Sequence, residues 1–352
     1  MTLEETIHKI APLNQAAMDA AQKRWNSIAK PLNSLGLLEK AVIQIAGITA
    51  NPQISLAKRG VVVMCADNGV VAQGVTQTGS EVTAVVTENL TKCETSVCKM
   101  AQVAGAQVFP VDIGVARDVS GDGLIIRKVA YGTQDMTETA AMTRQQAVQA
   151  LEIGINLVGE LKAQGYKILA TGEMGIGNTT TGSAIASVFL NETASMVTGR
   201  GAGLSNEGLE RKIAAIEKAI SVNQPDPEDA LDVLAKVGGL DIAGLAGVFL
   251  GGAAYRIPVL IDGFISSVAA LTAARICPKA RDYLMASHVS KEPAGAMLLT
   301  ELGTKPFLMA EMCLGEGTGA VAVLPILDMA CAVYNSMSTF EQIEIEEYQP
   351  QN

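Results

Sequence analysis

Residues 167–183, KILATGEMGIGNTTTGS, join a short apolar run to a glycine-rich turn and then to a polar helix start. The apolar run is typical of a buried strand, and the glycines allow the backbone to turn tightly into the helix that follows. Backbone N–H groups in such a turn, together with the positive end of the helix dipole, favour a bound anion. The segment predicts a strand–turn–helix unit of an α/β fold with a candidate phosphate site.

This turn has the spacing of a nucleoside triphosphate loop, G-x-x-x-x-G-K-[ST], from Gly172 to Thr179, but Asn178 stands in place of the lysine. Because that lysine contacts the β and γ phosphates, its absence favours a nucleoside monophosphate over a triphosphate. A strand-to-helix turn that binds nothing is the alternative. The candidate phosphate-binding and ribose-binding residues in the turn are Gly175, Ile176, Gly177, Asn178 and Thr179.

The composition excludes several other classes of protein. The 352 residues include 34 glycines and are 49% hydrophobic but only 4% aromatic, which suits a compact α/β protein with many tight turns. With a net charge of −10 and scattered basic residues, we expect neither a nucleic-acid nor a membrane partner. The six cysteines form no C-x-x-C pair and there are only two histidines, so we expect no metal and no cofactor. The first ten residues lack the features of a signal peptide, which predicts a cytoplasmic protein.

Strand-like runs alternate with helical segments along the chain. Five apolar runs have the pattern of buried parallel strands: 60–67, 106–112, 166–171, 257–262 and 283–286. Their alternation with helices predicts a mostly parallel, doubly wound, Rossmann-like sheet. Asp67 and Asp262 end two of these runs and Glu173 follows a third. We expect these acids to share the rim at the carboxyl ends of the strands, where such folds bind ligands.

Helical patterns at both ends of the chain predict a small helical domain. Residues 3–30 are helical in pattern up to the Lys30-Pro31 pair, and residues 329–348 are helical in pattern too. We therefore divide the chain into an N-terminal part of the small domain (1–36), an α/β domain (37–328) and a C-terminal part of the small domain (329–352).

A second glycine turn contains Gly201 and Gly203 and leads into a helix whose start we expect at Ser205 or Asn206. A second helix N-terminus could face the same anion, which makes both glycines and Lys212 candidates for the phosphate and ribose. Spacing alone favours a solvated helix face for Lys212.

A third glycine turn places Glu316 between Gly315 and Gly317. Glycines on both sides allow a backbone shape that other residues resist, so the acid could be aimed at a ligand. A carboxylate in apolar surroundings has a raised pKa and can act as a general base near neutral pH. The alternative is an acid that merely stabilises a helix N-terminus.

Five ordered blocks carry a family resemblance: EMGIGNTTTGSA, GRGAGLSNEGL, GGLDIAGLAGVFLGG, RIPVLIDGFISS and LGEGTGA. They resemble the nicotinate-nucleotide:dimethylbenzimidazole phosphoribosyltransferases of cobamide (vitamin B12) lower-ligand assembly, over nearly the whole chain. The resemblance implies transfer of 5-phosphoribose from nicotinate mononucleotide to a base nitrogen, with inversion to an α-riboside 5′-phosphate and release of nicotinate. It also implies a homodimer, with a small helical domain built from both termini.

The resemblance also implies roles for particular residues. Glu316 would be the general base that takes the proton of the incoming base as it attacks C1′ of the ribose. Glu173 would stabilise the positive charge that develops on the ribose. The turn at 173–179, and the Gly201 turn with Lys212, would surround the phosphate and ribose.

The chain departs from the family pattern around the acceptor base. Family members commonly read G-D-H-G-V, whereas residues 66–70 read ADNGV, and Gly79 and Val85 replace a usual proline and glutamine. Met174 and Leu314 flank the two motif acids and could be pocket walls or ordinary core. The candidate acceptor-pocket residues are Asp67, Asn68, Ser80, Val85, Met174 and Leu314.

These departures leave alternatives open. The acceptor could be dimethylbenzimidazole, another benzimidazole, adenine or a phenol, and the phenol-using and p-cresol-using relatives work as a pair of unlike subunits, so the partner could be a related chain. A catalytically silent nucleotide-binding subunit is a third hypothesis, which the retained Glu316 disfavours. An ATPase is disfavoured by Asn178.

Overall fold

The computed structural model describes residues 1–349, and its core is a six-stranded sheet in the order β3-β2-β1-β4-β5-β6 with every pairing parallel. The strands are β1 (Arg59–Ala66), β2 (Ala106–Gly114), β3 (Ile125–Ile126), β4 (Ile168–Met174), β5 (Val259–Ile261) and β6 (Leu284–Ala286). The order reverses between β1 and β4, as in dinucleotide-binding folds. The predicted α/β class is confirmed, and β3 was missed because two residues carry no periodicity.

Helices fill the connections between the strands. Those of the first half are α1 (Leu3–Lys9), α2 (Gln15–Ser27), α3 (Leu37–Thr49), α4 (Glu81–Thr91), α5 (Ser96–Ala104), α6 (Arg144–Ala163) and α7 (Asn178–Leu190). Those of the second half are α8 (Ala194–Val197), α9 (Asn206–Asn223), α10 (Ala230–Val237), α11 (Leu240–Tyr255), α12 (Phe264–Ile276), α13 (Gly295–Leu302) and α14 (Thr318–Ser336). The short 3₁₀ helices among the described residues are η1 (Gly69–Gln73), η2 (Pro278–Tyr283) and η3 (Glu341–Ile343).

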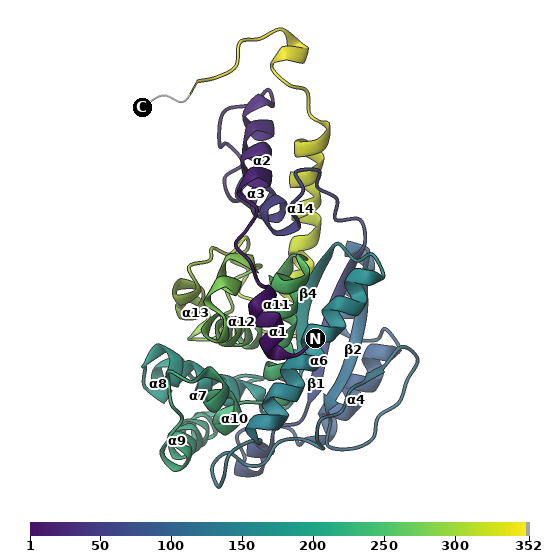
Figure 1. Ribbon diagram of the computed structural model, residues 1–352. Helices are drawn as coiled ribbons and strands as arrows, with labels where there is room; N and C mark the ends of the chain where they lie inside the picture. The colour runs from purple at the N-terminus through teal and green to yellow at the C-terminus, as the bar shows by residue number, and fades with distance from the viewer. Residues whose placement is uncertain (350–352) are drawn as a thin grey trace.

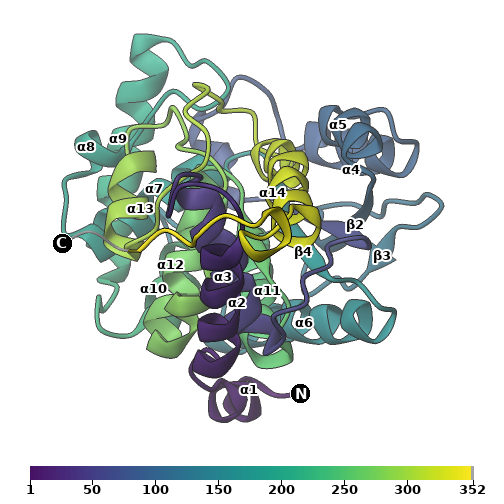
Figure 2. The same cartoon turned by 90° about the horizontal axis from the view of Figure 1, so that it is seen from above.

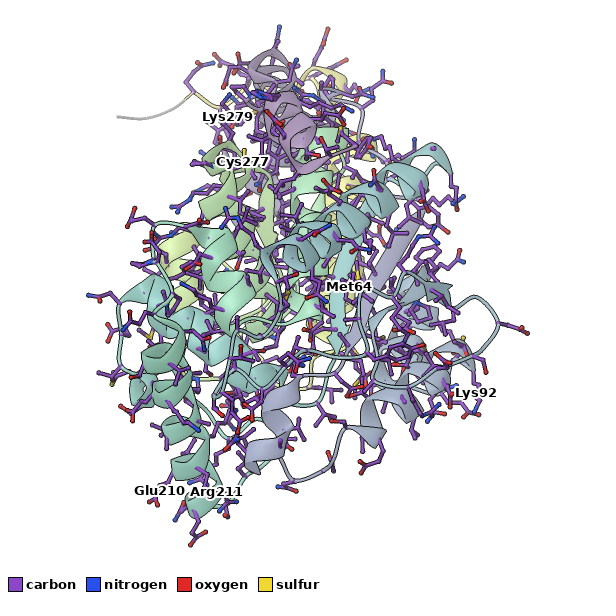
Figure 3. All side chains as sticks on the ribbon, turned by 60° about the horizontal axis from the view of Figure 1, so that its bottom comes forward. Met64, Lys92, Glu210, Arg211, Cys277 and Lys279 are labelled. Atoms are coloured by element: carbon purple, nitrogen blue, oxygen red, sulfur yellow. The ribbon has the colours of Figure 1, made fainter. Side chains whose placement is uncertain are left out.

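The sheet is covered on both faces, which is why its strands are continuous apolar runs. Every residue of β1 is buried, and Met64 lies at the centre of the molecule among side chains from both sides (Figure 3). Helices α4, α5 and α14 lie on one side of the sheet, and α11 and α12 on the other, with α6 packed on α11 (Figure 2). This arrangement makes the loops at the carboxyl ends of the strands the open rim of the fold.

Helices from both ends of the chain stand together beyond the sheet. Helix α3 packs against α2 and α14, and these helices project from the α/β body (Figure 1). The Trp25 and Tyr334 rings join α2 to α14, with centroids 5.2 Å apart. Helix α1 instead packs on α6 and α11. The division at residues 36 and 328 stays a prediction, and the packing of α3 favours a first boundary after residue 49.

The prediction of a helical tail is wrong beyond Ser336. The backbone becomes extended at Met337, where α14 ends, and Thr339 forms a bridge with Ile28. Two backbone hydrogen bonds to the end of α2 hold this segment: Ala29 N–H donates to Ser338 at 3.0 Å, and Phe340 N–H donates to Ser27 at 3.0 Å. Apart from η3, residues 337–349 are not helical, and residues 350–352 of the predicted domain lie outside the described part of the chain.

Within residues 1–349, α14 alone is long and apolar enough to cross a membrane by length and composition. Of its most apolar stretch, 56% is buried inside the protein. It packs against α3, α5 and β4, so its apolar surface is used by the core.

Glycines let α6 and α11 approach closely, and this contact gives a stability prediction. A Cβ at Gly154 would lie 2.1 Å from the Gly244 carbonyl oxygen, which belongs to the rigid backbone of α11. Gly154→Ala is therefore expected to lower the free energy of unfolding in urea by about 1–3 kcal/mol, because the helices must separate. Gly159→Ala in the same helix is the matched control.

At Gly159 the new Cβ would meet only the far end of the Tyr255 side chain, which can rotate away. Alanine also has the better helix propensity, so the unfolding free energy should stay equal or rise. If both variants lost the same stability, close backbone packing would not explain the glycine at 154.

Candidate active site

A cavity of about 330 Å³ opens at the rim where the parallel strands end. Its walls come from the segments that follow β1, β4, β5 and β6, and from the loop before α14. This volume is in the range of small-molecule sites. Glu173, at the carboxyl end of β4, and Asp262, directly after β5, both line it, which confirms that these two acids share one rim.

The glycine-rich turn forms one wall of the cavity and leads directly into the N-terminus of α7. Gly177 has a φ of 92°, a left-handed conformation that favours glycine. A Cβ at Gly175 would lie 2.5 Å from the Ala66 carbonyl oxygen, so this glycine is required by close packing on β1. The Ile176 N–H donates to the Thr83 hydroxyl at 3.1 Å, so this amide is already used within the protein.

Lys212 is fully buried, contrary to the expectation from spacing alone. Its ammonium donates to the Thr179 hydroxyl at 2.8 Å and to the Gly199 carbonyl at 3.1 Å, which joins α9 to both glycine turns. Its chain neighbours Glu210 and Arg211 instead point outward from α9 (Figure 3). Burial lowers the pKa of Lys212 to about 8. Ser205 caps this helix, as predicted, by accepting the Gly208 N–H at 3.2 Å.

Asn178, in the position of the missing lysine, joins two acids. Its side-chain amide donates to Glu173 and, at 2.9 Å, to Asp241. Burial, and next the Asp241 carboxylate, raise the pKa of Glu173 to about 8, while burial raises the pKa of Asp241 to about 6. The raised pKa favours the neutral form of Glu173 in the free protein.

Glu316 lies on a strained turn next to the cavity. Its φ is 60°, and the flanking Gly315 and Gly317 have φ values of 93° and 99°. Its carboxylate accepts the Val97 N–H at 3.1 Å, from the first turn of α5. A Cβ at Gly315 would collide with the Glu173 carboxylate, so Glu173 lies against the turn that contains Glu316. The glycine pattern around Glu316 thus has the backbone shape that the sequence predicted.

The structure brings together most, though not all, of the predicted site residues. Those on the cavity wall are Glu173, Met174, Gly175, Ile176, Gly177, Asn178, Thr179, Gly201, Leu314 and Glu316. Lys212 lies directly behind Thr179. The predicted residues that do not line the cavity are Gly203, Asp67, Asn68, Ser80 and Val85.

The candidate acceptor-pocket residues that follow β1 lie away from the cavity wall, and their contacts explain why. Asp67 is buried and accepts the Ala116 N–H at 2.7 Å, and Asn68 donates to the Ile176 carbonyl at 3.4 Å, so it supports the glycine turn from behind. Ser80 is the N-cap residue of α4. Val85 is 49% exposed, whereas its neighbour Val86 lines the cavity, because adjacent helical residues face different directions.

Several cavity residues were missed by the sequence reasoning. His288 and Glu292 follow β6, and the rule that placed Asp67 and Asp262 at the strand ends would also have singled them out. Burial lowers the pKa of His288 and raises the pKa of Glu292. Residues 75–78, which form another part of the wall, carried no signal in the sequence.

The chain is similar to several known proteins. A phosphoribosyltransferase family model, DBI_PRT, matches residues 10–345. The nicotinate-nucleotide–dimethylbenzimidazole phosphoribosyltransferases of Ruminiclostridium cellulolyticum and Acetivibrio thermocellus are each 48% identical to the chain, over 99% of both proteins. The chain is also similar to the crystal structure of CobT from Thermus thermophilus, with a TM-score of 0.90 and 35% sequence identity. The match covers 95% of this chain and 100% of the Thermus chain.

Proposed function

Because the chain belongs to this phosphoribosyltransferase family, we propose that it transfers the 5-phosphoribosyl group of nicotinate mononucleotide to a benzimidazole base such as 5,6-dimethylbenzimidazole. It is a transferase, and the product is the α-riboside 5′-phosphate from which the lower ligand of a cobamide is made. The observation that carries the proposal is the position of Glu316 on the same cavity as the glycine-rich start of α7.

The proposed reaction exchanges one bond at C1′ of the ribose. A ring nitrogen of the base attacks C1′ while the bond from C1′ to the pyridinium nitrogen breaks, and the electron pair of that bond neutralises the pyridinium charge as nicotinate leaves. The Glu316 carboxylate takes the proton from the other ring nitrogen of the base. Attack opposite the leaving group inverts the β linkage to α.

The phosphate is proposed to lie at the start of α7. Gly177, Thr179 and Gly201 line that part of the cavity, and the Lys212 ammonium lies behind Thr179. A phosphate dianion there gains from the helix dipole and from the buried positive charge. Asn178 does not replace the missing lysine as a phosphate ligand in this proposal, because its side-chain amide donates to Glu173.

Glu173 is proposed to respond to the charge of the substrate. In the free protein burial keeps its carboxyl mostly neutral, since its pKa is about 8. The positive pyridinium ring, and then the positive charge that develops on the ribose, both favour the ionised form. Glu173 would then stabilise that charge as the bond to nicotinate breaks.

The acceptor pocket is proposed to be the apolar part of the cavity, between Met174, Val86 and Leu314. The relatives described above carry dimethylbenzimidazole in their names, which favours a benzimidazole over a phenol or p-cresol. Neither a phenol-using subunit nor a catalytically silent subunit has support from these relatives. We also propose a cytoplasmic homodimer with a small helical domain formed by both termini.

A product assay on the purified chain tests the function. Nicotinate mononucleotide is offered with 5,6-dimethylbenzimidazole, adenine, phenol and p-cresol in parallel, and nicotinate and the riboside phosphate are quantified. We expect the highest kcat/KM with dimethylbenzimidazole and no need for a second protein. Transfer to phenols alone, or no transfer from nicotinate mononucleotide to any acceptor, would contradict the proposal.

A further inference from the structure

We propose that Asp262 is the positioning residue of the general base: it fixes the start of α14 from the neighbouring strand β5 and thereby holds Glu316 in place. The inference deepens the proposed function and rests on it, since Glu316 is the base of that reaction. It follows from three sets of contacts around the turn that contains Glu316.

The first set is the cap that Asp262 provides for α14. One carboxylate oxygen accepts the Gly317 N–H at 3.1 Å, and the other accepts the Ala320 N–H at 2.9 Å. The first N–H groups of a helix have no partner within the helix, and the N-cap residue of α14 is a glycine without a side chain to supply one. Asp262 supplies this cap from another element, 58 residues away in the chain.

The second set of contacts holds Asp262 itself. Its own N–H donates to the Ser266 hydroxyl at 3.0 Å, and its carbonyl accepts from the Ser287 hydroxyl at 3.2 Å. The backbone of Asp262 is therefore anchored at the junction of β5, α12 and the segment after β6. At 2% exposure it has little freedom to turn toward a ligand.

The third set of contacts links the position of α14 to the position of Glu316. Residues 315–317 all have left-handed φ values, a strained arrangement that persists only where the surroundings hold it. A Cβ at Gly172 would lie 2.2 Å from the Glu316 carbonyl oxygen, and a Cβ at Gly319 would lie 1.9 Å from Nδ1 of His288. The turn is thus confined by β4 and by His288. The two hydrogen bonds to the Asp262 carboxylate hold it in this space.

A direct contact between Asp262 and the substrate is the competing explanation, because Asp262 also lines the cavity. Both carboxylate oxygens are already used by backbone N–H groups, which leaves their remaining lone pairs in a buried position. The two explanations differ in a measurable way. A substrate contact contributes to the affinity for nicotinate mononucleotide, whereas a positioning residue acts on kcat.

The test is Asp262→Asn, measured in three ways. Asparagine has one acceptor oxygen, so one of the two N–H groups loses its partner and faces an NH₂ group instead. We expect kcat with dimethylbenzimidazole to fall by about 10- to 100-fold, because misplacement of a reacting group by about 1 Å can cost about 10²-fold. The Kd of nicotinate mononucleotide should change by less than about twofold, and amide hydrogen exchange at Gly317 and Ala320 should become faster.

Asp112→Asn is the matched control. Asp112 is also buried near the carboxyl end of a strand, where it accepts the Val115 N–H at 2.9 Å and pairs with Lys128 at 3.0 Å, but it does not line the cavity. This variant should lose stability without a change in kcat or in exchange at the start of α14. If Asp262→Asn does not fold, Asp262→Glu is measured instead: it keeps both acceptor oxygens but displaces them by one methylene, and the same three results are expected.

The inference is overturned if kcat is unchanged, if the Kd rises as much as kcat falls, or if exchange at the start of α14 does not change. Its failure is distinguishable from failure of the proposed function. A wild-type protein without transfer activity would contradict the function, whereas the exchange measurement would still test the cap.

Discussion

Glu316→Gln is expected to lower kcat for transfer by about 10²–10⁴-fold, the usual contribution of a positioned general base. Glutamine has nearly the same shape and can still accept the Val97 N–H, which Glu316 accepts at 3.1 Å, so the turn should keep its geometry. It cannot take the proton of the attacking base. The Kd of nicotinate mononucleotide should therefore change little, while steady-state kinetics with dimethylbenzimidazole show the loss.

Glu311→Gln is the control for this variant. Glu311 lies in the same loop, also has a left-handed φ of 52°, and is exposed, with its carboxylate 3.4 Å from the exposed Lys291. Its substitution removes the same charge from the same loop without touching the cavity, so kcat should stay within about twofold, since surface pairs contribute little. If Glu316→Gln kept wild-type turnover, the proton would have to go to another group.

Lys212→Met is expected to lower kcat/KM for nicotinate mononucleotide by about 10²–10³-fold. The variant removes the buried positive charge that faces the substrate phosphate, and the loss of one partner of such a pair costs about 2–5 kcal/mol. Methionine is uncharged and similar in length, so it can remain in the buried position that Lys212 occupies. Lys218→Met on the same helix is the control. Lys218 is exposed, and its replacement should leave kcat/KM unchanged.

The affinity for ribose 5-phosphate should report the charge of Lys212 directly, because this ligand has the phosphate but no pyridinium ring. Burial lowers the pKa of Lys212 to about 8, so the ammonium loses its proton as the pH rises through that value, and the Kd should increase. In Lys212→Met the Kd should be higher throughout and should not increase further across this range. A wild-type Kd that is constant from pH 7 to about 9.5 would show that the phosphate does not depend on Lys212.

Glu173 is expected to have the opposite effect on the Kd of nicotinate mononucleotide, which carries the pyridinium ring. Through this acid, the Kd should decrease as the pH rises. Burial raises the pKa of this acid to about 8, so its negative charge appears as the pH rises, and that charge favours the positive ring. The comparison of ribose 5-phosphate with nicotinate mononucleotide therefore separates the two groups. This is why the smaller ligand is the better probe of Lys212.

Much of the fold could be predicted from the sequence because its signals are local. A run of buried β-branched residues such as β1 can satisfy its backbone and its apolar side chains only in the middle of a parallel sheet, so its pattern identifies it. Glycines at 175, 177, 315 and 317 marked the turns that need close packing or left-handed φ values. The two acids beside these turns, Glu173 and Glu316, were found for the same reason.

The tail and the lining of the cavity were harder to predict because they depend on which face of an element is turned inward. The tail after Ser336 has a helical pattern, but its hydrogen bonds go to the end of α2, a partner distant in the sequence. Val85 and Val86 are adjacent and chemically alike, yet only Val86 lines the cavity, because the rotation of α4 is set by its packing. Local patterns do not contain that rotation.

Consecutive residues were enough to predict the fold class, the glycine turns and the acids beside them, since each of these follows from local conformational preferences and burial. The positions of these groups and the shifts in their pKa values instead depend on packing between distant segments. Lys212 is buried because α9 packs on both glycine turns, and the pKa of Glu173 is raised because burial and Asp241 make its negative charge costly. Asp262 caps a helix 58 residues away because β5 ends beside it. Such effects depend on distances through space, which a linear sequence does not record.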